Sequence, residues 1–192
     1  MVTFVFSVTA ILIVPFVAVY TNGITDADYI VPVFGIMLTA AWGMYCIRLP
    51  YNIVVLAIGH YRQTQTSAII EAVLNLATAI ALVLKFGLVG VAVGTFVAMV
   101  YRTCYLAWYI SRNVINRSLW VFVKHLCVDA CSIALFVVLI YYIMGPIQEL
   151  RENSYLEWGV LAIKTSVLGL LTINAVNMLF YFKKFSWLVK KR

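Results

Sequence analysis

Six separate stretches of this sequence are apolar over about 20 residues, the length that a helix needs to cross the hydrocarbon core of a bilayer. Hydrophobic residues make up 65% of the chain and charged residues only 11%, against about 25% charged in soluble domains, so a water-soluble fold is excluded. The connections between the stretches are too short to form separate domains. The sequence therefore predicts an all-α integral membrane protein with one six-transmembrane-helix bundle over residues 1–192. The spans are expected at about 1–20, 30–59, 66–84, 88–110, 119–143 and 157–182.

The second stretch, residues 30–59, is too long for one straight span and too short for two spans with a loop. It contains Pro50, which removes a backbone donor and clashes with the preceding turn. We expect one long helix that is kinked at this proline.

The basic residues favour one orientation in the membrane. If the amino terminus is cytoplasmic, nine lysines and arginines fall on the cytoplasmic side and two, Lys85 and Arg151, on the opposite side. Both termini are then cytoplasmic. The net charge of +7 is thus an orientation signal, and no nucleic-acid partner is expected, because the basic residues are divided among short loops.

The cysteines do not indicate a metal site. In "HLCVDAC", His125 and Asp129 share one helix face, while Cys127 and Cys131 point roughly the opposite way. One helix cannot bring all four side chains to a single ion, so we expect structural thiols, no metal and no cofactor.

A polar stripe runs along the third stretch. Ser67, Asn75, Thr78 and Lys85 all lie within about 40° of Glu71 around the helix axis. Because polar groups facing lipid are unfavourable, the stripe faces either a water-filled cavity or neighbouring helices to which it hydrogen-bonds. Glu71 and Lys85 at the two ends are also placed as interfacial charges would be.

The fifth and sixth stretches carry shorter polar features. His125, Asp129 and Ser132 share a face in the cytoplasmic half of the fifth stretch, either as a helix end near headgroups or as a cavity lining. Lys164 lies less than two turns from the outer end of the sixth stretch, so its amine is able to reach the interface.

Gly90 and Gly94 form a G-x-x-x-G pattern in the fourth stretch. Small residues at this spacing let two helix backbones approach closely in a membrane, so both are predicted helix-packing positions. Gly87, together with Lys85, marks a tight turn before them, which predicts a hairpin of the third and fourth helices.

Arg102 lies well inside the fourth apolar stretch. Placing a cation at this depth is unfavourable by at least ~2.5 kcal/mol on membrane-insertion scales, so another interaction must offset this insertion free energy. Three explanations remain open: an ion pair with Glu71 or Asp129, a place in a cavity lining together with Arg48, or snorkelling to the cytoplasmic surface.

Residues 69–110, "IIEAVLNLATAIALVLKFGLVGVAVGTFVAMVYRTCYLAWYI", resemble the polysaccharide exporters of the multidrug/oligosaccharidyl-lipid/polysaccharide flippase superfamily. The pattern is E-A-x-x-N-L, then L-V-x-K-x-G-L-x-G-V-A-x-G-T, then an arginine in the next turns. "PFVAVYTNGITDADYI" (15–30) and "RLPYNIVVLAIGHYRQT" (48–64) are also similar to this family. The resemblance covers residues 10–115 well and the rest loosely.

The resemblance implies a fold, an activity and a location. Such flippases have two six-helix lobes around a central cavity, and this chain matches the carboxy-terminal lobe, which fits the abrupt start at Met1. The implied activity is transfer of an undecaprenyl-diphosphate-linked oligosaccharide, such as an O-antigen unit, across the bacterial inner membrane. The implied partners are membrane lipid, the lipid-linked oligosaccharide, and an amino-terminal lobe or a second chain.

Family cavities are often cationic, which suits a diphosphate. The candidate substrate-binding residues by position are Arg48, Arg102, Lys164, Glu71, Asn75, Thr78 and Asp129.

Two other function classes remain open. A drug or cation antiporter of the same superfamily would have a cavity led by carboxylates, for which only Glu71 and Asp129 are available. A membrane enzyme or assembly partner of envelope polysaccharide synthesis is the third class. Such an enzyme would need a sizeable outer loop or a buried histidine, and the longest outer connection is 144–156, so we expect no catalytic activity.

Overall fold

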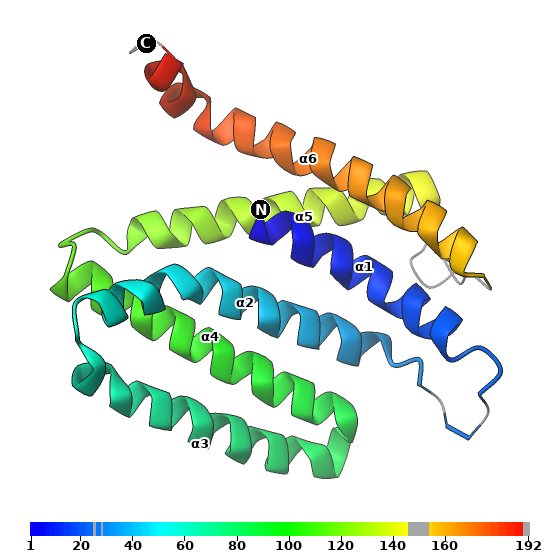
Figure 1. Cartoon of the computed structure of the whole chain (residues 1–192), viewed down its shortest axis with the longest axis horizontal. Helices are drawn as coiled ribbons and strands as arrows, with labels where there is room; N and C mark the ends of the chain where they lie inside the picture. The colour runs from blue at the N-terminus through cyan, green and yellow to red at the C-terminus, as the bar shows by residue number, and fades with distance from the viewer. Residues whose placement is uncertain (25, 28, 146–153, 190–192) are drawn as a thin grey trace. The chain divides into compact units, whose positions relative to one another are not determined.

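The structure, a computed structural model, describes residues 1–24, 26–27, 29–145 and 154–189, with side chains up to residue 180. Within these ranges every regular element is an α-helix (Figure 1). The helices are α1 (Val2–Tyr20), α2 (Pro32–Ala57), α3 (Tyr61–Phe86), α4 (Leu88–Asn113), α5 (Trp120–Met144) and α6 (Tyr155–Val189).

Six helices in the described part of the chain are long and apolar enough to cross a membrane. This confirms the all-α membrane fold with six spans. The protein is therefore a multi-pass membrane protein. The connection around Arg151 and the last three residues of the basic tail lie outside the described residues.

The helix bounds differ from the apolar spans mainly at polar ends. α3 begins at Tyr61 rather than near 66, because Arg62, Gln63 and Gln65 continue the helix beyond the apolar window. α2 is a single helix with Pro50 inside it, as expected for one long span.

The helices form two compact units, one of α1, α5 and α6 and one of α2, α3 and α4. In the first unit the core cluster joins residues from all three helices. It consists of Val8, Ile11, Leu12, Phe136, Ile140 and Leu161. The assignment of residues 1–192 to a single lobe stays a prediction.

In the second unit α4 is the central helix, since it packs along both α2 and α3 (Figure 1). Its buried face is made largely of small residues, among them Ala92, Ala98 and Ala107, each at most 1% exposed. Buried Thr103 adds an interhelical hydrogen bond, because its hydroxyl donates to the carbonyl oxygen of Met44 in α2 at 3.1 Å. Small side chains and such hydrogen bonds are the ordinary means of helix association in lipid.

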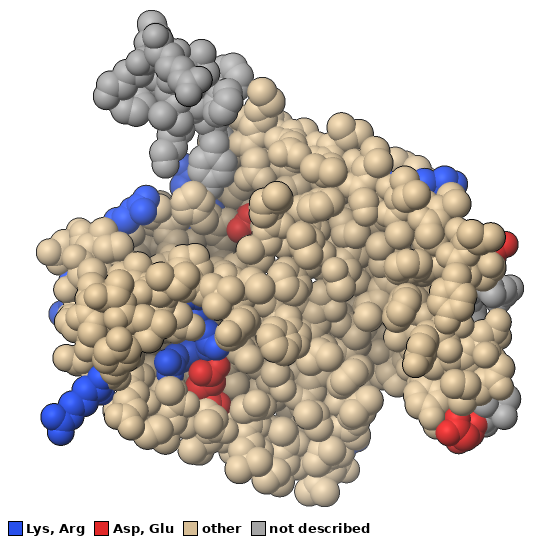
Figure 2. All heavy atoms as spheres, in the orientation of Figure 1, with Lys and Arg blue, Asp and Glu red and all other residues tan. Residues whose placement is uncertain are grey.

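α3 has two contrasting faces. One face carries large apolar side chains that are 56–85% exposed, at the spacing of a continuous helical stripe: Ile69, Val73, Leu76, Ile80 and Leu84. An apolar face of this kind is suited to contact with lipid tails. Figure 2 shows a face of the molecule on which uncharged side chains predominate and charged ones are sparse.

A charged cluster between three helices

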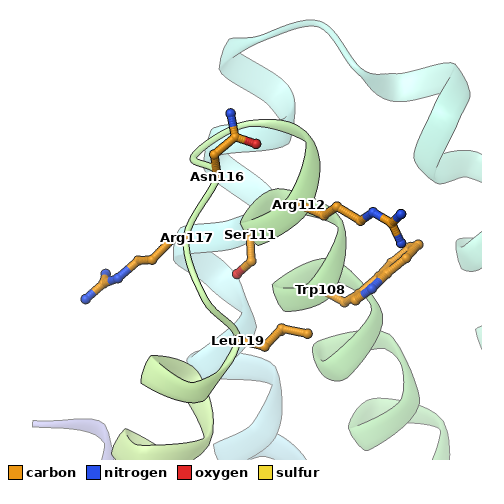
Figure 3. A pocket seen from close by; sticks show the side chains of 6 residues that line it. All are labelled: Trp108, Ser111, Arg112, Asn116, Arg117 and Leu119. Atoms are coloured by element: carbon orange, nitrogen blue, oxygen red, sulfur yellow. The ribbon is translucent and has the colours of Figure 1, made fainter.

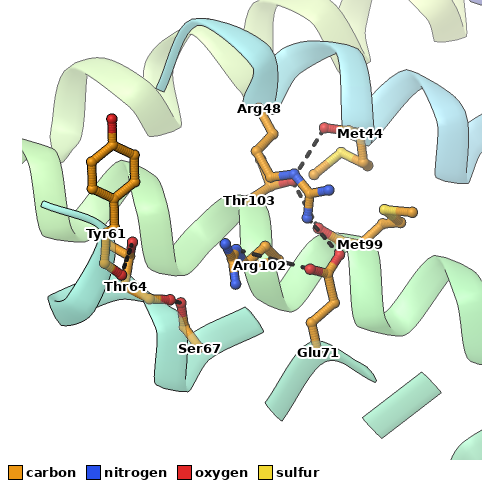
Figure 4. Close-up of polar contacts among 9 residues, drawn as sticks. All are labelled: Met44, Arg48, Tyr61, Thr64, Ser67, Glu71, Met99, Arg102 and Thr103. Carbon is orange, nitrogen blue, oxygen red and sulfur yellow. Dashed lines mark hydrogen bonds and ion pairs between the residues drawn. The ribbon is translucent and has the colours of Figure 1, made fainter. Parts of the chain in front are cut away.

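Three charged side chains from three different helices of the second unit meet: Arg48 of α2, Glu71 of α3 and Arg102 of α4 (Figure 4). One guanidinium nitrogen of Arg48, Nη1, lies 2.5 Å from Glu71 Oε1 and donates a hydrogen bond to it. Arg102 Nε lies 3.9 Å from the other carboxylate oxygen, Oε2. Glu71 thus binds Arg48 closely and Arg102 only at long range.

The cluster is well shielded. The side chains are 7% exposed for Arg48, 13% for Arg102 and 19% for Glu71. The ring of Tyr45, one turn before Arg48, lies 5.0 Å from its guanidinium carbon, a cation–π distance. Arg48 therefore has an anionic partner and an aromatic partner, which offset part of its desolvation.

Positive charge exceeds negative charge in this cluster. Residues 30–122 contain one acidic residue, Glu71, so the two arginines share a single carboxylate. Three buried guanidinium nitrogens lack a hydrogen-bond partner: Arg48 Nε, Arg102 Nε and Arg102 Nη1. Unpartnered buried donors are costly, and guanidinium groups present paired donors that match phosphate oxygens. The arrangement can accept an anion, chiefly at Arg102.

The other polar side chains of the α3 stripe that form hydrogen bonds do so with α4 or with the backbone of α3 itself. Asn75 Oδ1 lies 3.4 Å from the hydroxyl of Thr95 in α4, at the limit of a hydrogen bond. The hydroxyls of Ser67 and Thr78 donate to carbonyl oxygens of α3 itself. Lys85, at the end of α3, is exposed.

Gly90 and Gly94 lie where α4 packs directly against the backbone of α3. A Cβ atom at Gly90 would be 2.5 Å from the carbonyl carbon and oxygen of Leu82. A Cβ atom at Gly94 would be 2.9 Å from the backbone nitrogen of Ala79. The turn between the helices is made by Gly87, whose φ of +57° is in the left-handed region that favours glycine. These glycines let the backbones of α3 and α4 pack directly against each other.

The two remaining site candidates belong to the other unit. Asp129 Oδ1 accepts a hydrogen bond from the hydroxyl of Thr3 at 2.8 Å, which joins α5 to α1. Lys164 of α6 is exposed. Within the unit of α2, α3 and α4 the structure brings Arg48, Glu71 and Arg102 together.

Sequence reasoning missed two features of this region. The sequence does not predict the pairing of Arg48 with Glu71, because its pattern allows Glu71 to be a partner of Arg102, an interfacial charge or a substrate contact. The sequence does contain a pattern that predicts the contact between Tyr45 and Arg48, because an aromatic residue and a cation three residues apart on a helix are neighbours.

Among the described residues, no three His, Cys, Asp or Glu side chains are grouped as metal ligands would be. Comparisons of the chain with protein-family models, curated proteins and solved structures found no match. The functional argument therefore depends on the residues and on the geometry of the cluster.

Proposed function

We propose that this chain is the carboxy-terminal lobe of a flippase that moves an undecaprenyl-diphosphate-linked oligosaccharide across the membrane for polysaccharide export. The observation that carries the proposal is the surplus of buried positive charge, two arginines against one carboxylate, between three membrane-spanning helices. A diphosphate is the charged part of such a substrate, and it would supply the anion that the cluster lacks. The resemblance of residues 10–115 to polysaccharide exporters supports the same class.

In this proposal the two arginines have different roles. Arg48 is held by Glu71 at 2.5 Å and by the ring of Tyr45, so it mainly orients the carboxylate. Arg102 keeps two buried nitrogens without a hydrogen-bond partner, and it is the residue that would contact the diphosphate. A planar guanidinium suits this contact because it donates two parallel hydrogen bonds to phosphate oxygens.

The antiporter alternative has less support. It needs a carboxylate available to a cation, and Glu71 already binds Arg48 while Asp129 accepts a hydrogen bond from Thr3. Asn75 and Thr78 remain candidates for contacts to the glycan, and Lys164 for a second contact to anionic groups.

The proposal includes a location and partners. The lobe would act in a bacterial inner membrane with both termini cytoplasmic, paired with an amino-terminal lobe around a shared cavity. Membrane lipid and the lipid-linked oligosaccharide would be its other partners.

Replacing Arg102 tests the function. The test uses a transporter in which this lobe supports export. Arg102→Gln should leave membrane abundance near normal and reduce export of the polysaccharide by at least about tenfold, because a loss of ~1.4 kcal/mol in the contact with the diphosphate corresponds to a factor of ten. Arg102→Lys should retain partial export, since it keeps the charge without the paired donors. The measurements are membrane abundance and polysaccharide at the cell surface. Full export from the Gln variant would remove Arg102 from the substrate contacts.

The orientation has its own test. Single cysteines at Asp26 and Asn113, in a chain whose four native cysteines are replaced, should react differently with an impermeant maleimide in intact cells. Labelling is expected at position 26, because the connection before α2 is assigned to the outside, and not at position 113. Labelling at 113 in intact cells would reverse the orientation.

A further inference from the structure

The single carboxylate of the charged cluster contacts its two arginines unequally. Glu71 Oε1 accepts a hydrogen bond from Arg48 Nη1 at 2.5 Å, while Oε2 lies 3.9 Å from Arg102 Nε (Figure 4). The second distance is too long for a hydrogen bond. An anion that reached Arg102 would therefore displace a weak contact there and leave the stronger contact between Glu71 and Arg48 in place.

The guanidinium of Arg102 has donors left for such an anion. Its Nε and Nη1 are both buried without a hydrogen-bond partner. In Figure 4 the terminal nitrogens of Arg102 point away from the carboxylate of Glu71. A guanidinium binds phosphate oxygens through two parallel hydrogen bonds, so a phosphate group on that side can use these donors. Glu71 is then a negative charge close to the bound phosphate.

A second pair of arginines in the same unit lacks this arrangement. Arg112 is in the last turn of α4, with its guanidinium carbon 5.8 Å from the centre of the Trp108 ring, and Arg117 is in the loop that follows. The two side chains point away from each other on opposite sides of that loop (Figure 3). They do not converge on one anion, so Arg112 provides a control for a cation outside the cluster.

The net charge of the cluster is lower than a diphosphate needs. Two arginines and one carboxylate leave one positive charge. A diphosphate that joins a lipid to a sugar has two negative charges, one on each phosphate. Residues 30–122 contain no acid besides Glu71, so without its carboxylate the two arginines would match both phosphate charges. The charge of Glu71 thus opposes binding of the diphosphate.

We propose that Glu71 sets the affinity of this site by competing with the diphosphate of the substrate for Arg102. This inference rests on the proposed function, because it takes the diphosphate as the anion. In the empty site Glu71 offsets part of the desolvation of both arginines. In the occupied site Arg102 contacts phosphate, while Arg48 and Tyr45 keep the carboxylate in place. A transporter has to release its substrate as well as bind it, and a like charge beside the phosphate favours release.

Binding of an undecaprenyl-diphosphate-linked monosaccharide to the purified full chain in detergent tests this role, with the dissociation constant measured by microscale thermophoresis. Glu71→Gln should bind at least about tenfold more tightly than the wild type, because a like charge several ångströms from the phosphate is removed. A purely structural role of Glu71 would not tighten binding. Arg102→Gln should bind at least about tenfold more weakly, because the contact with the phosphate is lost.

Variants at Arg48 test the competition without relying on the stability of Glu71→Gln alone. Arg48→Gln frees Glu71 to pair with Arg102, so it should weaken binding by about tenfold although Arg48 does not contact the phosphate. Arg48→Gln/Glu71→Gln also removes the competing charge, and it should return the affinity to within about threefold of the wild type. A double variant that binds as weakly as Arg48→Gln would overturn the proposal.

Two control variants make the same chemical changes outside the cluster. Glu157→Gln removes an exposed carboxylate of α6, and Arg112→Gln removes an exposed arginine of α4. Both should bind within about twofold of the wild type, because charges at exposed sites are screened. A gain in Glu157→Gln equal to that in Glu71→Gln would assign the effect to overall charge and reject the competition at Arg102.

The outcomes separate this inference from the proposed function. If the wild type binds and Arg102→Gln does not, but Glu71→Gln binds no more tightly than the wild type, the role of Glu71 is wrong and the proposed function stands. If the wild type does not bind, or if Arg102→Gln binds as well as the wild type, the proposed function fails and the role of Glu71 fails with it.

Discussion

Glu71→Gln is expected to destabilise the protein by about 3 kcal/mol, the lower end of the range for removing one partner of a buried ion pair. Glu71 is the only acid in the unit of α2, α3 and α4, so its loss leaves Arg48 and Arg102 without any negative charge. The effect stays near the lower end because the amide oxygen of glutamine still accepts one hydrogen bond. Thermal or denaturant unfolding of the purified protein in detergent measures the change.

The geometry also predicts an order among related variants. Arg48→Gln should be milder than Glu71→Gln, because Glu71 then keeps Arg102, at 3.9 Å, as a partner. Glu71→Gln combined with Arg48→Gln should recover about half of the lost stability, since one of the two unpaired cations is gone. If Glu71→Gln were as stable as the wild type, or if Arg48→Gln were the more harmful change, the cluster would not stabilise the fold as described.

Gly90→Leu is expected to prevent close packing of α3 against α4 and to leave little folded protein. The atoms that a side chain at Gly90 would meet are backbone atoms of Leu82 and Val83, at 2.5 and 2.8 Å, and these cannot rotate away as a side chain can. Even Gly90→Ala should cost roughly 1–3 kcal/mol through overpacking. Gly94→Ala should be somewhat milder, because one of its close neighbours is the hydroxyl of Thr78, although the backbone of Ala79 is also at 2.9 Å.

The control for Gly90 is Gly159, which lies in α6 and has open space around it. Gly159→Ala should be neutral or stabilising, by up to ~1 kcal/mol, because alanine is the better helix former. The measurement is the yield of monodisperse protein and its unfolding transition. Equal stability of Gly90→Ala and Gly159→Ala would show that the approach of α4 to α3 is looser than described.

Much of the fold follows from local pattern. The six apolar stretches predicted six helices, and the G-x-x-x-G pattern with Gly87 predicted the hairpin of α3 and α4, which the structure has. These features depend on one helix at a time or on neighbours in the chain. Where the bounds differ, as at the start of α3, polar residues extend a helix beyond its apolar part, and hydropathy does not record this.

The candidate site was only partly predictable. Helical periodicity correctly groups Glu71 with Asn75 and Thr78 on one side of α3, because it sets the angle of each residue around its own axis. It does not set how far one helix is displaced along another. That displacement decided that Glu71 meets Arg48, 23 residues earlier in the sequence, more closely than it meets Arg102.

Sequence alone is enough to establish a multi-pass membrane protein, because six segments in the described part of the chain are each long and apolar enough to form a spanning helix. The sequence also shows two arginines embedded in apolar segments of residues 30–122, with a single acid available to them. Which arginine that acid holds, and which has more unpartnered donors, depends on the tertiary structure. The reason is that an ion pair between three helices depends on their mutual register, which arises from the close packing of small residues on α4 against both of its neighbours.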